Sequence, residues 1–362
     1  MAAVETTVGP EAGFTLAEIL VALLLTLLIV TAALWLLATD TALAESLPQA
    51  TDLQQRGRLG LSLIAGDLAR AGAGPAYGRL AGGLGRSLPP VLPRRVGLTG
   101  TDPFSSALTD AVTILWSPAP GQATELAAPV AGGTPTLSVS AAANCGGLPL
   151  CGFTEGTNVL IFDETGRHGV YVLTALSGAL ATLRSLQPSA PTFSAGAVVV
   201  PIESRTYVFD AAARQVRAYD GYLSDAVVID DVVGMEVTYA GEGRPPVRPK
   251  PQVGEANCLF DAAGNAVAAL STLPPAGASL AALPLELFQD GPWCGDGDRR
   301  FDVDLMRVRA VGIRLRLEAG LDQARGPGLD FRRPGRNTRP LAAVPDLTLT
   351  MEVTPWNLNQ GR

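Results

Sequence analysis

One stretch near the start of the chain is apolar without interruption. From Ile19 to Ala38 no residue carries a charge and no proline occurs. A helix needs about 20 such residues to cross the hydrocarbon core of a bilayer, so this run predicts a membrane-spanning helix. A single carboxylate, Glu18, stands directly before it. A charge at the edge of a membrane helix is costly, which indicates a functional role for this acid.

The helical pattern continues beyond the apolar run, from residue 39 to residue 71. Pro48 predicts a kink or a local opening of this helix, and Gly72 predicts its end. Apolar residues recur at helical spacing at Leu53, Leu61, Ile64 and Leu68, with Leu59 and Leu63 beside them. We expect one long helix whose first half is in the membrane and whose second half packs on a soluble body.

The remainder of the chain shows short strand patterns separated by turn-forming residues. The strands between residues 159 and 202 are closely spaced, which is typical of a small all-β meander or barrel. The predicted strands are Ala111–Trp116, Thr136–Ser140, Val159–Phe162, Gly169–Leu173, Ala181–Leu186, Ala197–Ile202, Arg205–Asp210, Gln215–Tyr219, Val233–Tyr239, Val311–Leu317 and Leu347–Val353. Arg205–Asp210 and Gln215–Tyr219 are expected to pair as a hairpin. The whole predicts an α+β fold: a long N-terminal helix packed on antiparallel β-sheet, with a β-rich insertion and long loops.

Three stretches are rich in glycine, proline or arginine and show little periodicity: 73–109, 240–283 and 319–345. We expect the first to be a surface excursion and the second a long loop. The third is expected to be a mobile, solvated loop or a contact with another subunit.

Composition narrows the class of function. The 362 residues, 47% of them hydrophobic, suffice for one large domain or two modest ones beyond the anchor. The net charge of −7 argues against a protein built mainly to bind nucleic acid, whose surface would be basic. The four cysteines permit disulfides if the body lies outside the cytoplasm. No cofactor is expected.

The residues before the apolar run, Gly13-Phe14-Thr15-Leu16-Ala17-Glu18, resemble the prepilin signature of type IV pilins and type II secretion pseudopilins. The resemblance implies that prepilin peptidase cleaves after Gly13, that Phe14 becomes the N-methylated N-terminus, and that Glu18 acts in assembly. The leader lacks the lysines and arginines usual in the family. Two other interpretations of the apolar run are a plain signal anchor and a cleaved signal peptide with a site at 42–44.

The prepilin resemblance divides the chain into four parts. Residues 1–13 are the leader and 14–38 the transmembrane half of the helix. Residues 39–72 are its amphipathic half, and 73–362 form a β-rich periplasmic or extracellular body.

The amphipathic half also resembles that of the PilW-type minor pilins and, more loosely, of the J-type pseudopilins. The matching stretches are Gln55-Arg56-Gly57-Arg58 and Ala65-Gly66-Asp67-Leu68-Ala69-Arg70-Ala71-Gly72. The strand order is also similar, with a tyrosine-containing strand at 205–209, a strand at 308–315 and a final Asn357-Leu358 pair. The resemblance implies a non-enzymatic minor pilin that primes or tips a type IV pilus.

The implied partners are prepilin peptidase, other major and minor pilins, the inner-membrane assembly platform and membrane lipid. The implied location is the inner membrane, with the body in the periplasm, and then the pilus at the cell surface. The alternatives are a J-type pseudopilin of a type II secretion system and a membrane-anchored periplasmic ligand-binding or adhesive protein.

Four groups of residues are candidate chemical sites. His168, the only histidine, lacks a Gly-x-Ser-x-Gly nucleophile and is predicted to lie at a hairpin turn. Asp296, Asp298, Asp302 and Asp304 form a weak calcium candidate, although Arg299 and Arg300 fall among them. The arginines of the 319–345 loop favour a solvated loop or a subunit contact over DNA binding; they are Arg325, Arg332, Arg333, Arg336 and Arg339. The cysteines lack metal-site spacing and predict two local disulfides, Cys145–Cys151 and Cys258–Cys294.

Overall fold

The computed structural model describes residue 13 and residues 15–360, apart from 77, 99, 133–135, 141–151, 179, 187–189, 268, 275–279 and 340–341. The described residues form one long helix, several short 3₁₀ turns and antiparallel sheets, so the fold class is α+β. The chain divides into two compact units. The first comprises Met1–Asp52 and Ala319–Pro345, and the second comprises Leu53–Glu318 and Asp346–Arg362.

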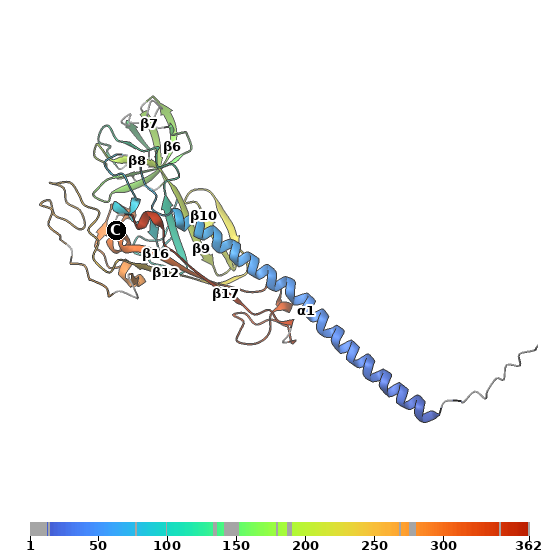
Figure 1. Cartoon of the computed structure of the whole chain (residues 1–362). Helices are drawn as coiled ribbons and strands as arrows, with labels where there is room; N and C mark the ends of the chain where they lie inside the picture. The colour runs from blue at the N-terminus through green and yellow to red at the C-terminus, as the bar shows by residue number, and fades with distance from the viewer. Residues whose placement is uncertain are drawn as a thin grey trace, which may run out of the picture. The chain divides into compact units, whose positions relative to one another are not determined.

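The long helix, α1, spans Leu16–Arg70 and is labelled in Figure 1. Within the first unit, every side chain from Leu16 to Ala38 is exposed. The helix continues through Pro48, so the local opening predicted there does not occur. Proline lacks a backbone N–H, so one hydrogen bond of the helix is missing at this position. The residues of the neighbouring turns keep their N–H donors, and the helix continues.

The described residues of the second unit form four antiparallel sheets, parts of which are visible in Figure 1. In a five-stranded sheet the order is β1 (Val91–Leu92), β2 (Ala111–Trp116), β9 (Glu203–Asp210), β10 (Gln215–Tyr219) and β11 (Asp225–Ile229). A four-stranded sheet has the order β13 (Ala281–Leu283), β12 (Val232–Gly241), β16 (Val308–Leu317) and β17 (Leu347–Val353). A two-stranded sheet pairs β14 (Trp293–Cys294) with β15 (Phe301–Asp302).

The largest sheet has six strands and its own hydrophobic core. Its order is β3 (Thr124–Glu125), β8 (Val198–Pro201), β5 (Asn158–Phe162), β6 (His168–Ser177), β7 (Leu180–Ser185) and β4 (Thr136–Ser140). Alternation along β5 and β6 places Val159, Ile161, Tyr171 and Leu173 in that core. The closely spaced strands predicted for 159–202 and the β9–β10 hairpin are confirmed. Strands β5, β6 and β7 pair in sequence order, but β8 returns to pair with β5, so the segment is not a simple meander.

The strands predicted at Val311–Leu317 and Leu347–Val353 are also confirmed, and they pair with one another. In the same sheet, Val237 lies opposite Ile313 and Met235 opposite Leu315, and all four side chains are buried. Cross-strand apolar pairs of this kind stabilise an antiparallel sheet, so β12 and β16 provide the centre of the four-stranded sheet.

The second half of α1 belongs to the second unit and buries the predicted apolar face. Leu53, Leu61, Ile64 and Leu68 are buried, whereas Leu59 and Leu63 are exposed. Two glycines lie on the buried face of the helix. A Cβ atom on Gly57 would come within 2.6 Å of Leu349, and one on Gly60 within 2.2 Å of Ile229. These glycines therefore let the helix backbone approach β11 and β17 closely.

Replacing Gly60 by Ala should destabilise the protein by about 1–3 kcal/mol, because the new methyl group collides with the buried Ile229. The matched control is Gly66→Ala on the same helix, where a Cβ meets no atom within 4 Å. There the better helix propensity of alanine should stabilise by about 0.5–1 kcal/mol. Denaturant unfolding of both variants measures the two effects; a gain in stability for Gly60→Ala would contradict the close contact.

The surface excursion predicted for 73–109 is wrong over residues 84–94. Leu84, Leu88, Val91 and Leu92 are almost fully buried there, and Arg94 is 4% exposed. Prolines favour an extended backbone, and an edge strand tolerates their missing donors. The segment accordingly pairs with β2 as the edge strand β1 and fills the core with its aliphatic side chains.

The solvated loop predicted for 319–345 is wrong at Arg325, which is 1% exposed. Its guanidinium donates to the Ala319 carbonyl at 2.6 Å and pairs with Asp322. Backbone hydrogen bonds within the segment join Val344 to Ala324 and Asn337 to Arg325. Arg325 therefore holds this segment together, while Arg332, Arg333, Arg336 and Arg339 are exposed.

Candidate functional site

The start of α1 is capped by two of its own side chains. Thr15 precedes the first helical residue, and its backbone N–H and its hydroxyl both donate to Oε2 of Glu18 at 2.9 Å. The backbone N–H of Glu18 in turn donates to Oγ1 of Thr15 at 3.3 Å. This is the reciprocal capping box of a Thr-x-x-Glu sequence, which satisfies donors that the first turn leaves unpaired. Glu18 thus has a structural partner within the chain, Thr15.

The bond after Gly13 lies directly before this cap. Gly13 is exposed, and a Cβ built on it would meet nothing within 4 Å. Neither space nor backbone conformation requires glycine there, so any requirement for it comes from outside the chain. Phe14 lies outside the described residues.

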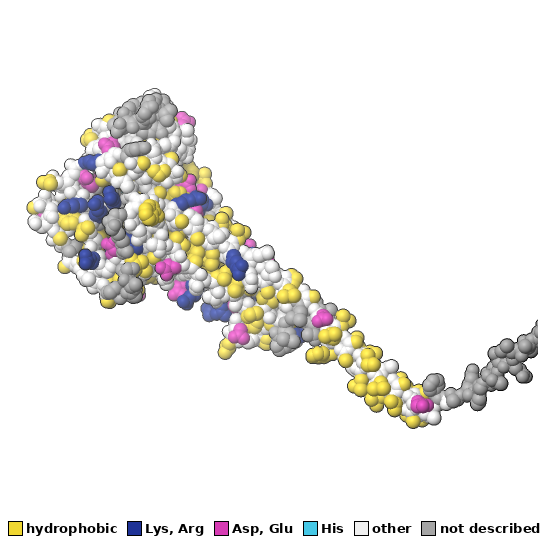
Figure 2. Space-filling model, viewed as in Figure 1, with side chains coloured by type: hydrophobic (Ala, Val, Ile, Leu, Met, Phe, Trp, Pro, Cys, Tyr) yellow, Lys and Arg dark blue, Asp and Glu magenta, His cyan; other side chains and the backbone are white. Residues whose placement is uncertain are grey.

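The helix that follows is long enough and apolar enough to span a membrane. Its 23 residues, Leu16–Ala38, cover about 35 Å of helix axis, slightly more than the ~30 Å of a hydrocarbon core. Two threonines fall in this stretch, and both donate to carbonyls one turn back. The Thr26 hydroxyl bonds to Ala22 at 3.0 Å, and the Thr31 hydroxyl bonds to Leu28 at 3.1 Å. The two threonine hydroxyls are therefore satisfied within the helix, as hydrocarbon requires. Figure 2 shows the apolar side chains that cover this part of α1.

Asp67 attaches the second half of α1 to the five-stranded sheet. The Tyr207 hydroxyl donates to its carboxylate at 2.7 Å, and Arg205 and Arg70 lie within 3.8 Å and 3.7 Å of it. Burial and the neighbouring Asp67 raise the pKa of Tyr207, which keeps the phenol protonated as the donor. Asp67 falls within the stretch that resembles PilW-type minor pilins, but sequence patterns assigned it no contact.

A second ion-pair group holds Arg56, one turn before Gly60. Arg56 donates to Asp231 at 2.9 Å, and Arg214 lies 3.5 Å from the same carboxylate. Arg214 also pairs with Glu318, whose side chain is fully buried. Because a buried carboxylate needs a counter-charge, Arg214 links the helix contact to the end of β16.

The four acids of the calcium candidate are not brought together. Asp302 and Asp304 cluster with Asp290, their carboxylates lying within 4.8 Å of one another. Asp296 is instead 3.4 Å from Arg167, and Asp298 is exposed. The Asp302 carboxylate accepts from the backbone N–H of Asp304 and of Gly291. Of the four predicted acids, only Asp302 and Asp304 belong to this group, and Asp290 is its third member.

Asp304 is almost fully buried and lies 2.6 Å from the buried Arg307. Burial raises the pKa of Asp304 to about 6; Arg307 opposes this rise, and Asp302 and Asp290 add to it. The folded protein therefore holds this proton more tightly than the unfolded chain, whose pKa is near 3.8. A carboxyl group whose pKa is raised by folding stabilises the folded protein at low pH. This contribution is lost as the pH rises from about 4 to 6.

The free energy of unfolding of Asp304→Asn should therefore rise relative to that of the parent as the pH increases, by about 2 kcal/mol between pH 4 and pH 7.5. The measurement is denaturant unfolding, followed by tryptophan fluorescence, at both pH values with a chelator present. Glu155→Gln, at an exposed acid, is the control and should show no such trend. A difference between parent and Asp304→Asn that is independent of pH would contradict the raised pKa. Repeating the series with calcium tests the metal interpretation of these acids directly.

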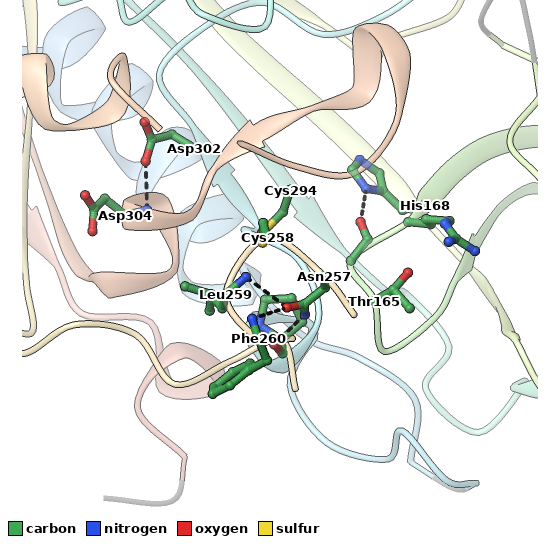
Figure 3. Close-up of a disulfide and its surroundings, with 12 residues drawn as sticks. Thr165, His168, Asn257, Cys258, Leu259, Phe260, Cys294, Asp302 and Asp304 are labelled. Carbon is green, nitrogen blue, oxygen red and sulfur yellow. Dashed lines mark hydrogen bonds between the residues drawn. A yellow bond between two sulfur atoms is a disulfide. The ribbon is translucent and has the colours of Figure 1, made fainter. Parts of the chain in front are cut away.

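The disulfide predicted between Cys258 and Cys294 is confirmed, with the two Cα atoms 5.1 Å apart (Figure 3). It ties the long loop after β12 to the short strand β14. Beside it, Oδ1 of Asn257 accepts from the backbone N–H groups of Leu259 and Phe260 at 2.9 Å. Cys145 and Cys151 lie outside the described residues.

His168 is the first residue of β6, at the hairpin that sequence patterns predicted. Its Nδ1 lies 3.2 Å from the Gly166 carbonyl, and its ring packs against Phe301. A dashed line marks this hydrogen bond of His168 in Figure 3. Burial lowers the pKa of His168 to about 4, so the imidazole is neutral near pH 7. His168 is therefore a partly buried packing residue whose ring forms one hydrogen bond.

Comparison with known proteins finds no family model that matches the chain, no curated protein that matches it and no solved structure that matches it. Function is therefore inferred from the residues and their geometry.

Proposed function

We propose that this chain is a minor pilin of the PilW type. After cleavage by prepilin peptidase, it would be a structural component that primes the assembly of a type IV pilus or lies at the tip of the pilus. One observation carries the proposal: α1 is a single helix with two environments. Its first 23 residues expose every side chain, and it opens on a capped glutamate directly after Gly13-Phe14. Its last turns bury one apolar face in the β-rich body.

The exposed segment and the buried segment support different parts of this proposal. A stretch of fully exposed leucines is unstable in water and needs lipid or other apolar helices around it. Membrane lipid before assembly, and neighbouring pilin helices afterwards, provide those surroundings. The contacts of Gly57, Gly60, Arg56 and Asp67 fix the helix to antiparallel sheet, the arrangement expected of a pilin body.

The location follows from the same features. A single spanning helix anchors the protein in the inner membrane, and we place the body in the periplasm, then in the pilus at the cell surface. The Cys258–Cys294 bond favours this placement, since disulfides persist in oxidising compartments. The partners would be the peptidase, other major and minor pilins, and the inner-membrane assembly platform.

A J-type pseudopilin of a type II secretion system shares the cleaved leader and the helix, so it is the first alternative. A membrane-anchored periplasmic binding or adhesive protein is the second, and the cavity described below is the observation that favours it. Neither alternative assigns catalysis to the chain. Deletion strains distinguish the first two proposals, because loss of twitching points to a pilus and loss of enzyme secretion to a secretion system.

The test is the N-terminal sequence of the mature protein, made with and without prepilin peptidase. With the peptidase present, the chain should begin at an N-methylated Phe14. Gly13→Ala should still be cleaved, whereas Gly13→Leu should not, although neither disturbs the fold because Gly13 has no neighbours. A mature protein that begins at Met1, or at any residue other than Phe14, would overturn the assignment.

A further inference from the structure

A cavity lies where the five-stranded and six-stranded sheets meet. Its walls come from β1, β2, β5 and β6, from the loop after β1, and from the 3₁₀ turn Gly297–Arg299. Val170 and His168 face it because they alternate along β6 with Tyr171, which points into the core of the six-stranded sheet. The cavity measures about 60 Å³, room for roughly four to six water molecules or a short organic molecule.

Most of the cavity wall is apolar, and leucine, valine and isoleucine side chains provide it. They are Leu92, Val96, Leu115, Val170, Leu186 and Ile202. Such a surface gains free energy by burying the hydrocarbon part of a ligand, at about 25 cal/mol for each Å² removed from water.

Two donor nitrogens of one buried cation in the wall have no hydrogen-bond partner among the described residues. Arg299 is 5% exposed, and its Nε and Nη2 atoms form no hydrogen bond within the part of the chain that the structure describes. Buried polar atoms of Asn158 and Ser204, which also line the cavity, lack partners in the same way. Asp298 and Asp296 act electrostatically on the charge of Arg299, but they leave these donors without an acceptor. Buried donors without an acceptor are costly, and a bidentate carboxylate is the group that the planar guanidinium fork fits best.

A second buried arginine holds the first in place. Arg94 is 4% exposed, and its Nη2 donates to the carbonyl of Arg300 at 2.9 Å, next to Arg299 in the chain. Its other terminal nitrogen donates to the Phe104 carbonyl, and the neighbouring Asp102 favours its charged form electrostatically. Burial lowers the pKa of Arg94 to about 10, and the group is still a cation near pH 7. The cavity wall thus carries two buried positive charges.

Two acids line the cavity, and among the described residues neither forms a hydrogen bond or an ion pair with Arg94 or Arg299, although Asp298 acts electrostatically on Arg299. Asp220 already accepts three backbone N–H groups, from Tyr222, Leu223 and Ser224. Asp298 is exposed to solvent and forms no ion pair among the described residues. His168 is neutral and donates its Nδ1 proton to the Gly166 carbonyl.

We propose that this cavity binds a small monocarboxylate, with the acid group on Arg299 and a short apolar body against the aliphatic wall. The proposal goes beyond the role as a minor pilin and does not depend on it, because the cavity is built from the body alone. It adds a receptor function to the body.

The test uses the full-length chain in lipid nanodiscs, with empty nanodiscs as the blank. Pentanoate should show saturation-transfer NMR signals and raise the unfolding temperature, whereas pentanamide, which has the same shape without the charge, should bind at least roughly tenfold more weakly. Arg299→Gln should lower pentanoate affinity by a similar factor. Arg58→Gln, at an exposed helix position, is the matched control and should bind like the parent.

A second variant guards against misfolding at position 299. Val170→Phe fills the cavity with an apolar group, and it should abolish binding while the protein retains its cooperative unfolding. The proposal is overturned if pentanoate fails to bind, if it binds Arg299→Gln as tightly as the parent, or if inorganic phosphate binds as tightly as pentanoate. The last outcome would identify a general anion site with no use for the apolar wall.

Discussion

Replacing Glu18 by Gln should leave cleavage and membrane insertion intact but lower the amount of this subunit in sheared pili by roughly tenfold or more. Once Phe14 is the N-terminus, its amine is a cation within about one helical turn of Glu18. In a bilayer neither charge is well solvated, so each needs a counter-charge. A pair between neighbouring subunits would fix the axial register as a new subunit enters the fibre.

The capping box provides a rival explanation, and glutamine separates the two. Glutamine at the third helical position still accepts the hydrogen bonds of Thr15, so Glu18→Gln retains the cap and removes only the charge. Thr15→Val does the reverse: it removes the hydroxyl contact and retains the carboxylate. If the charge pair drives assembly, Glu18→Gln is impaired and Thr15→Val is close to the parent.

The measurement is the ratio of this subunit in sheared pili to that in membranes, by quantitative immunoblot. Equal incorporation of Glu18→Gln and the parent would show that the charge is dispensable. A defect in Thr15→Val as large as that in Glu18→Gln would assign the role of Glu18 to helix capping instead. Phe14 must be confirmed as the N-terminus in each variant, since uncleaved protein carries no amine there.

Local patterns predicted the elements of this fold well. The helical spacing of Leu53, Leu61, Ile64 and Leu68 identified the buried face of α1, and the alternation along 311–317 and 347–353 identified two paired strands. These predictions succeed because periodicity reports which side of an element is buried. The Thr-x-x-Glu sequence at Thr15 was equally visible, and it is the signal that could have found the helix cap.

Features that depend on contacts between distant segments were not predicted. The burial of residues 84–94 depends on pairing with β2, and their many prolines suggested a loop. Arg325 was grouped with exposed arginines because composition carries no information about which one is buried. Arg94 and Arg299 are separated by 205 positions in the chain, so only folding shows that they line one cavity. The calcium candidate shows the opposite case. Its four acids are close in sequence, but the structure does not bring their four carboxylates together.

Removing the Cys258–Cys294 disulfide should lower the free energy of unfolding by about 3–4 kcal/mol. The bond closes a loop with a sequence separation of 36, and a crosslink of that span restricts the unfolded chain by about this amount. The loop it closes has little regular structure between β12 and β14, so few other contacts replace the crosslink. The double substitution Cys258→Ser and Cys294→Ser avoids leaving a single reactive thiol.

Denaturant unfolding of the double variant and the parent gives the difference, and mass spectrometry of unreduced peptides verifies which cysteines are joined. A parallel pair of substitutions, Cys145→Ser and Cys151→Ser, tests the second predicted bridge. That bridge would close a much shorter loop, for which the same relation gives about 2 kcal/mol. If the two Cys258 and Cys294 thiols are free in protein purified from the periplasm, or if their removal changes stability by less than the experimental error, the disulfide does not hold this loop. The body would then depend for its stability on the sheets and the buried ion pairs alone.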